Sequence, residues 1–229
     1  MPPLKVRRFP VMRWAGGWLW WLGLRACLAA LVLVLIFAIF NPPTTMTIVQ
    51  NAREYLIAER EWTPIDEISP IMLRSVVAAE DANFCNHWGF DMAEIRRVIA
   101  SGGQGGASTI SQQTVKNVYL WQGRSWTRKA LEAGMTPMVE AVWTKRRILE
   151  VYLNVVEFGP GIFGIHAAAR HYFGTTPDKL GKVQAARLAA VLPSPKTRSV
   201  NLASRRSRAI ADGAATIAAD GRDACFKVD

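Results

Sequence analysis

The sequence lacks acidic residues in its first forty positions and lacks internal repeats and low-complexity tracts throughout its 229 residues. No Ser-x-x-Lys motif occurs, which excludes a serine acyl-transfer domain of the kind that depends on it. Alternating strand patterns are also scarce, and this favours a mainly α fold. What the chain has instead is 50% hydrophobic residues, so a disordered tail is not its main content. We expect one well-buried domain of ordinary size.

Basic residues exceed acidic ones, 28 to 18, for a net charge of +10. Five of them lie in the first forty positions, at Lys5, Arg7, Arg8, Arg13 and Arg25. The remaining 23 basic and 18 acidic residues leave a net charge of +5 on the rest of the chain. An excess of this size fits an anionic partner such as phosphate-bearing lipid, but it also fits nucleic acid or simple solubility. Charge alone does not choose among these.

A long apolar run follows the basic amino end and stops at Asn41-Pro42-Pro43. About 20 apolar residues span the hydrocarbon of a bilayer, so we expect a single transmembrane helix over residues 18–40. Arg25 lies early in the run, where its side chain can extend to the interface. The alternative is a cleaved signal peptide, but no small-x-small cleavage site follows Phe40 and the run exceeds an ordinary signal core.

The charge distribution predicts how the chain is divided and oriented. Positive charge before the helix predicts a cytoplasmic basic tail at residues 1–17 and a main domain on the far face of the membrane. Residues 41–61 then form a tether, and residues 62–229 form the domain. In a bacterium the far face is the periplasm or the outer surface.

Helical periodicity dominates the domain. Ser69 as cap and Pro70 in the first turn predict a helix that runs to Glu80. Further helices are expected at residues 108–120, 166–172 and 182–192. The longest candidate covers residues 127–153, and we expect Pro137, close to Gly134, to kink it or to split it in two.

The first cluster of chemical interest is Glu80-Asp81, followed at short spacing by Phe84, His87 and Gly89. A carboxylate pair at the end of an apolar helix supplies a candidate general base. Taken alone, such a pair is usually a solvated helix end. We assign His87 to a structural hydrogen bond, and Asp81 to orienting the turn rather than to proton transfer.

The second cluster is the string Gly-x-Ser-Thr-x-x-Gln-Gln-x-x-Lys-Asn, which begins at Gly106. Helical spacing places Thr109, Gln112, Gln113 and Lys116 along one side. A helix amino end preceded by Gly105-Gly106 is a natural anion site, because free N–H groups and the helix dipole favour negative charge. A capped amphipathic helix in water is the alternative. A third cluster holds Arg128, Lys129 and Glu132, and a fourth holds Lys145, Arg146, Arg147, Glu150, Tyr152 and Asn154.

As an ordered set, together with the runs 158–161 and 167–174, these clusters resemble the monofunctional biosynthetic peptidoglycan transglycosylases. This group belongs to glycosyltransferase family 51, which it shares with the amino-terminal domains of bifunctional penicillin-binding proteins. The resemblance covers about residues 62–200. It implies a lysozyme-like α-helical catalytic domain with a smaller, membrane-touching lobe, behind a single amino-terminal transmembrane helix.

The resemblance also implies an activity and its location. A lipid-linked disaccharide-peptide is transferred to the 4-hydroxyl of lipid II with loss of polyprenyl diphosphate, which builds glycan strands. The implied partners are lipid II, the growing strand and the membrane, with no nucleic acid, and cell-wall synthesis or division proteins are further candidates. The implied location is the bacterial inner membrane, with the domain in the periplasm. A divalent cation such as magnesium assists some members, and no metal ligands are assigned here.

The roles implied by the resemblance fall on specific residues. Glu80 is the general base, and Glu132 is a second catalytic glutamate near the diphosphate of the donor. The implied substrate-binding residues are Asp81, Ser108, Thr109, Gln112, Gln113, Lys116, Asn117, Arg128 and Lys129. The interrupted helix around Gly134 and Pro137 departs from the smoother helix expected of relatives.

Two other functions stay open from the sequence. A lysozyme-like hydrolase or lytic transglycosylase would use one glutamate without a cationic cluster. A membrane-anchored scaffold would not depend on Glu80. A bifunctional enzyme is not expected, because only about thirty residues follow Asn201 and no Ser-x-x-Lys motif occurs.

Two structural expectations remain. Cys27 lies in the membrane helix, so Cys85 and Cys225 are left to form a disulfide in an oxidising compartment, unless they lie too far apart. The run from Val118 to Trp121, together with Trp126, is either an apolar edge that enters the membrane interface or part of the core.

Overall fold

The computed structural model describes residues 10–103, 106–123 and 125–228, so most of the predicted basic tail and Gly105 lie outside the described residues. The helices are α1 Pro10–Ile39, α2 Met46–Asn51, α3 Pro70–Glu80, α4 Met92–Ala100, α5 Ile110–Tyr119, α6 Trp126–Val142, α7 Lys145–Val155, α8 Ile165–Phe173, α9 Lys182–Val191 and α10 Arg205–Asp220. Two short strands, β1 Glu157–Gly159 and β2 Ile162–Phe163, pair antiparallel. The prediction of a mainly α fold is confirmed.

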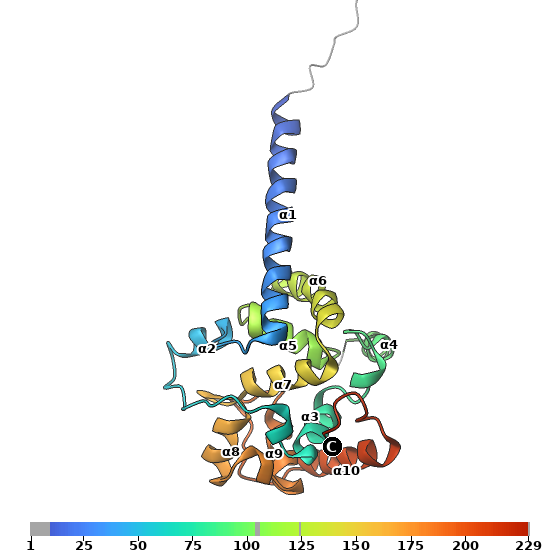
Figure 1. Cartoon of the computed structure of the whole chain (residues 1–229). Coiled ribbons are helices and arrows are strands. Elements are labelled where there is room, and N and C mark those ends of the chain that lie inside the picture. The colour runs from blue at the N-terminus through green and yellow to red at the C-terminus, as the bar shows by residue number, and fades with distance from the viewer. Residues whose placement is uncertain (1–9, 104–105, 124, 229) are drawn as a thin grey trace, which may run out of the picture.

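The domain is built in layers below a projecting helix (Figure 1). The helix α1 extends from the domain as a long rod, and α2, α5 and α6 lie around its lower end. The helix α7 packs against α5, and α3 packs against both α9 and α10. The largest fully buried side chains belong to Tyr152, Phe84, Phe158, Phe163 and Phe226. Burial of this apolar surface, at roughly 25 cal/mol per Å², is the main force that holds the helices together.

The helix α3 begins as predicted but is capped differently. Pro70 stands in its first turn, where a missing N–H does no harm. Ser69 occupies the cap position, yet its hydroxyl makes no capping hydrogen bond and instead donates to the Leu180 carbonyl at 2.9 Å. The predicted capping role of Ser69 is therefore wrong, because a partner distant in the sequence takes its hydroxyl.

The helix predicted over residues 127–153 is divided in two, but the division does not lie at Gly134 or Pro137. The helix α6 runs through both residues to Val142, and the chain leaves the helical conformation at Trp143. The Thr144 side chain then accepts a hydrogen bond from the Arg147 N–H at 3.1 Å and starts α7. A proline removes one helical hydrogen bond, and the packing of α6 against α1 and α5 compensates for that loss.

The segment 41–61 is more ordered than the predicted tether. It contains α2, whose Thr47, Ile48 and Asn51 are buried. The Gln122 side chain donates to the Thr47 hydroxyl at 3.0 Å, and the Gln122 N–H donates to the Gln50 side chain at 2.9 Å. These contacts hold α2 against the end of α5.

Among the described residues, one helix is long and apolar enough to cross a membrane, and its apolar stretch is Trp20–Ile39. Most of the side chains in that stretch are exposed, and the exceptions include Val34, which is buried near its lower end. The predicted aromatic edge below it divides in two: Val118 and Leu120 are buried in the core, whereas Trp121 and Trp126 are exposed. The run therefore divides between the two alternatives: Val118 and Leu120 belong to the core, Tyr119 is partly buried, and the two tryptophans present surface.

The carboxyl-terminal segment folds back onto the end of α3. Cys85 and Cys225 form a disulfide, with Cα atoms 5.6 Å apart, as the cysteine count predicted. Arg74 forms an ion pair with Asp223 at 2.7 Å, and Arg222 donates to the Ala82 carbonyl at 3.2 Å. The helix α10, which the sequence reasoning missed, is thereby held next to the first cluster.

Candidate active site

Glu80 is the last residue of α3, and its side chain is only 9% exposed. The Gln113 amide donates to Oε2 of Glu80 at 3.0 Å. A guanidinium nitrogen of Arg206, from α10, lies 3.5 Å from Oε1. The carboxyl group is therefore held from two sides at the edge of a cavity.

Burial raises the pKa of Glu80 above its ordinary value. The hydrogen bond from Gln113 opposes this shift, and so do the positive charges of Arg206, Lys116 and Arg198, in decreasing order. The net effect is still upward, because the carboxylate loses more hydration than its neighbours replace. A carboxylate with a raised pKa is a better proton acceptor, which is what a general base requires.

The Gln113 side chain is itself oriented by a hydrogen bond from the protein core. The hydroxyl of Tyr152, a fully buried residue of α7, donates to the Gln113 side-chain carbonyl at 3.2 Å. That contact leaves the amide nitrogen of Gln113 to face Glu80. The three side chains form a chain of hydrogen bonds from the core to the cavity.

Asp81 is buried, and both of its oxygens are used inside the protein. The His87 ring lies 2.9 Å from Oδ1, and the Ile110 N–H donates to Oδ2 at 2.9 Å. Both contacts hold the turn in place, which agrees with the orienting role expected of Asp81. Asp81 also lines a small cavity of about 220 Å³ together with Glu80 and Thr109, and its substrate-binding role stays a prediction. Its carboxylate occupies the amino end of α5.

The predicted anion site at the amino end of α5 is therefore wrong. The backbone N–H groups at this helix end already have partners inside the protein. Asp81 accepts from the Ile110 N–H, the Thr109 hydroxyl accepts from the Gln112 N–H at 3.2 Å, and the Gln112 side chain accepts from the Thr109 N–H at 3.1 Å. Thr109 also donates to the Gly89 carbonyl at 2.7 Å. Thr109 and Gln112 are both buried, so they join the first two clusters and leave Gln113 and Lys116 to face the cavity.

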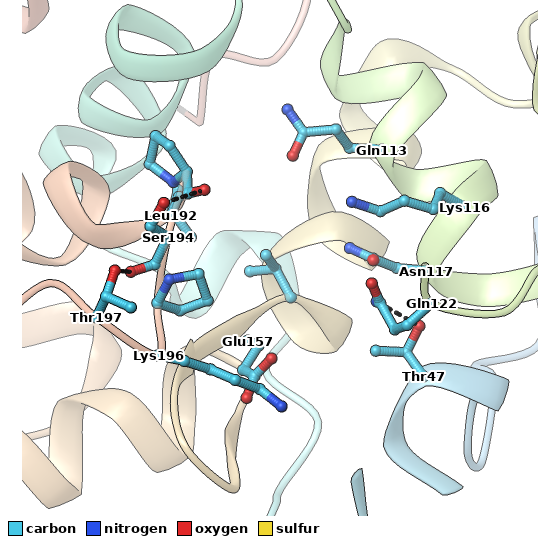
Figure 2. Close-up of a pocket in the computed structure, with 13 residues that line it drawn as sticks. Thr47, Gln113, Lys116, Asn117, Gln122, Glu157, Leu192, Ser194, Lys196 and Thr197 are labelled. Carbon is cyan, nitrogen blue, oxygen red and sulfur yellow. Dashed lines mark hydrogen bonds between the residues drawn. The ribbon is translucent and has the colours of Figure 1, made fainter. Parts of the chain in front are cut away.

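Lys116 lies one turn after Gln113 and points into open space (Figure 2). Its ammonium group has no hydrogen-bond or ion-pair partner among residues 10–103, 106–123 and 125–228. Burial lowers its pKa, the carboxylate of Glu132 opposes that shift, and the nearby Arg128 and Lys129 add to it. A cation in this setting is available to an anionic ligand.

Glu132 is nearly fully buried between two cations. Arg128 binds one oxygen at 2.6 Å, and Lys129 binds the other. Lys129 also donates to the Ser108 hydroxyl at 3.2 Å, so Ser108 borders the same group. With both oxygens of Glu132 engaged, these residues do not fit a bound divalent cation. No cluster of three or more metal-binding side chains occurs in the part of the chain that the structure describes.

A cavity of about 650 Å³ brings these groups together. It is lined by Glu80, Ser108, Gln113, Lys116, Arg128, Lys129 and Glu132, and also by Leu192, Pro193, Arg198 and Arg206. Arg198 and Arg206 were not predicted as site residues from the sequence. No local motif marks them, and only the missed helix α10 brings Arg206 to Glu80.

A second cavity of about 400 Å³ lies next to the first, and Figure 2 shows the residues that line it. The two share Gln113, Lys116, Leu192 and Pro193, so they form one groove. The second cavity is lined mainly by uncharged polar side chains, at Thr47, Asn117, Gln122, Ser194 and Thr197, with Glu157 and Lys196 at its lower end. Burial raises the pKa of Glu157, and one of its oxygens has no hydrogen-bond partner among the described residues.

Comparison with known proteins bears on this groove. The sequence model described as transglycosylase matches residues 47–217. A biosynthetic peptidoglycan transglycosylase of Jannaschia sp. (strain CCS1) is 57% identical over 205 residues, which cover 87% of this chain and 86% of that protein. A biosynthetic peptidoglycan transglycosylase of Yersinia pseudotuberculosis serotype O:1b (strain IP 31758) is 47% identical over 199 residues, which cover 80% of this chain and 83% of that protein.

Proposed function

Because the chain belongs to the transglycosylase family, as a monofunctional peptidoglycan glycosyltransferase that polymerises glycan strands, we propose that its substrate is lipid II. The donor is the strand attached to polyprenyl diphosphate, and the acceptor is the 4-hydroxyl of a lipid II molecule. The observation that carries this proposal is the cavity shared by a buried carboxyl group, Glu80, and the ammonium group of Lys116, which has no partner among the described residues. One can accept a proton and the other can bind a diphosphate.

The reaction assigns a role to each side of the cavity. Glu80 takes the proton of the acceptor hydroxyl as that oxygen forms a bond to the anomeric carbon of the donor. The bond between that carbon and the diphosphate oxygen breaks, and its electron pair stays on the diphosphate. A diphosphate leaves without protonation, so cations replace the general acid that a glycoside hydrolase needs.

Three cations are available for the leaving group. Lys116 has no ligand of its own among the described residues, whereas Arg128 and Lys129 are held in place by Glu132. We assign Glu132 to positioning these two side chains close to the diphosphate. Fixed charges in a partly dry cavity stabilise developing negative charge more strongly than mobile ones in water.

The second half of the groove suits the sugars of the same substrate. Hydroxyl and amide groups, such as those of Asn117, Gln122 and Ser194, can both donate and accept hydrogen bonds. Sugar hydroxyls and N-acetyl groups need partners of this kind. We therefore assign this half to the saccharide portion of the strand.

The location follows from the anchor and the disulfide. The helix α1 fits a single membrane anchor, and we propose that it places the domain in the periplasm with the amino terminus in the cytoplasm. The disulfide between Cys85 and Cys225 supports this side of the membrane, because such bonds persist in oxidising compartments. We propose that this membrane is the bacterial inner membrane, where the lipid-linked precursors are available.

The test is incubation of the full chain, reconstituted in lipid vesicles, with lipid II, followed by separation of polymer from precursor. Growth of glycan strands is expected. Cleavage of finished glycan in place of growth would favour the hydrolase or lytic alternative. No reaction with either substrate would favour a scaffold.

A further inference from the structure

The lower end of α1 is attached to the domain by specific contacts. Val34 is fully buried, and the Trp143 indole donates to its backbone carbonyl at 2.8 Å. The Phe37 ring lies 6.0 Å from the ring of Tyr119, at the end of α5. The anchor therefore does not hang from a free linker but enters the fold.

Arg147 caps the carboxyl end of this helix. Its guanidinium group donates to the Phe37 carbonyl at 3.1 and 3.2 Å, to the Phe40 carbonyl at 2.9 Å and to the Asn41 side chain at 2.9 Å. The last carbonyls of a helix lack helical partners, and the prolines that follow Asn41 have no N–H to offer. A cation at this end also opposes the negative pole of the helix dipole.

The domain holds the same guanidinium group from the other side. Arg147 donates to Glu150 at 2.8 Å, and the Trp62 indole donates to the same Glu150 oxygen at 3.1 Å. The guanidinium carbon lies 5.4 Å from the Trp62 ring and 6.0 Å from the Trp143 ring. The side chain is only 13% exposed, so its position is set before any substrate arrives.

The two helices that receive the anchor also carry groove residues. Arg147 stands near the start of α7, and the same helix carries Tyr152, which orients Gln113 toward Glu80. Tyr119 ends α5, which carries Gln113 and Lys116. The direction of α1 is thus tied through short, packed segments to the position of the cavity.

We propose that Arg147 is a positioning residue that sets the angle and height of the groove above the membrane. This inference rests on the proposed function, in which the lipid tail of the substrate stays in the bilayer that holds α1. A rigid attachment keeps Lys116 at the level of the diphosphate group, whereas a loose one would let the domain tilt away from it. Arg147 touches no substrate in this proposal.

The experiment compares Arg147→Gln with Arg146→Gln, each in the full chain reconstituted in vesicles. Arg146 is the matched control, because it is the preceding residue and binds Asp66 and the Lys227 carbonyl instead of the anchor. Each variant is assayed with lipid II in the same bilayer and with a short-tailed, water-soluble analogue in detergent. Arg147→Gln should lose about tenfold or more in rate on the bilayer substrate and less than about twofold on the soluble one, since small misplacements cost large factors in rate. Arg146→Gln should stay within about twofold on both.

An equal loss on both substrates, or no loss on either, would overturn the proposal. Inactivity of the unmodified chain on both substrates would instead refute the proposed function, so the two failures are distinguishable. Arg147→Lys should restore only part of the rate, because one ammonium group cannot bridge both carbonyls and Glu150.

A second measurement does not depend on activity. Cys27 is an exposed free cysteine in α1, and Lys179→Cys adds a second label at an exposed position of the domain. The distance distribution between spin labels at the two sites should broaden with Arg147→Gln and stay narrow with Arg146→Gln. A distribution that is unchanged by Arg147→Gln would overturn the proposal, even if that variant were less stable.

Discussion

The two halves of the groove meet at Gln113 and Lys116 and differ in charge. The first half gathers carboxylates and cations, from Glu80 to Glu132, in a partly buried cavity. The second half is lined by amide, hydroxyl and apolar side chains. Apart from Lys116 at the junction, its charged residues, Glu157 and Lys196, stand at the far end. Charge must move where bonds form and break, whereas recognition of a sugar needs only hydrogen bonds. The comparison therefore separates the residues expected to change the rate constant from those expected to change binding.

The largest effect is expected from Glu80→Gln. The amide keeps the shape of the side chain and can still accept the hydrogen bond from Gln113, but it cannot take a proton. Loss of a general base costs about a hundredfold to ten-thousandfold in rate. The measurement is polymer formation from lipid II, with thermal unfolding as the control for the fold. Near-full turnover by a folded variant would remove Glu80 from this role.

Lys116→Ala should come next. It removes the unpartnered cation of the first half, and removal of one stabilising group for developing charge costs on the order of a hundredfold in rate. Lys116 also favours the ionised form of Glu80, so its loss should move the acid limb of the rate profile to higher pH. Lys116→Arg should restore only part of the rate. Unchanged donor affinity and rate with alanine would refute the assignment to the diphosphate.

The pH dependence of the unmodified enzyme should also reflect the first half. The rate should rise with pH through the pKa of Glu80, which burial holds above its ordinary value, because only the ionised form accepts a proton. It should fall again at alkaline pH, through the pKa of Lys116, which burial holds below its ordinary value. Both limbs should thus lie closer to neutrality than those of exposed groups.

Arg206→Gln tests whether the pKa of Glu80 sets the acid limb of this pH profile. The positive charge of Arg206 opposes the rise in the pKa of Glu80, so its removal should move the acid limb to higher pH. The rate on the plateau should change much less, because Arg206 does not take the proton. Arg205→Gln is the control, since Arg205 is exposed and next in the chain. A profile that is identical for both variants would show that Arg206 does not influence Glu80.

The smallest effect is expected from Glu157→Gln in the second half. Glu157 lines the groove, one of its oxygens is buried without a hydrogen-bond partner among the described residues, and the amide keeps an acceptor in the side chain. The change should weaken substrate binding by no more than about fivefold, the scale of one hydrogen bond, and leave the pH profile unchanged. Glu59→Gln, at an exposed glutamate that does not line the groove, is the control. If Glu157→Gln lowered the rate as much as Lys116→Ala, the two halves would not differ in their roles in catalysis and in binding.

Local sequence was enough to predict the helical class, the membrane helix and most of the first half of the groove. Apolar residues at helical spacing specify α3, α5 and α7, because each helix must bury one face. The spacing of Gln113 and Lys116 places both on the same side of α5, and the structure shows that this side lies next to the helix end that carries Glu80. The cysteine count was enough to pair Cys85 with Cys225.

Tertiary structure alone decided the rest. Asp81 fills the amino end of α5, Arg206 approaches Glu80 from α10, and Arg147 holds the end of α1. Each of these contacts joins segments far apart in the chain, and each uses a charged side chain that could equally well have been in water. Hydrogen bonds and charges of this kind gain little until packing brings the partners together and removes the water. The periodicity of one helix carries no information about which distant group will lie against it.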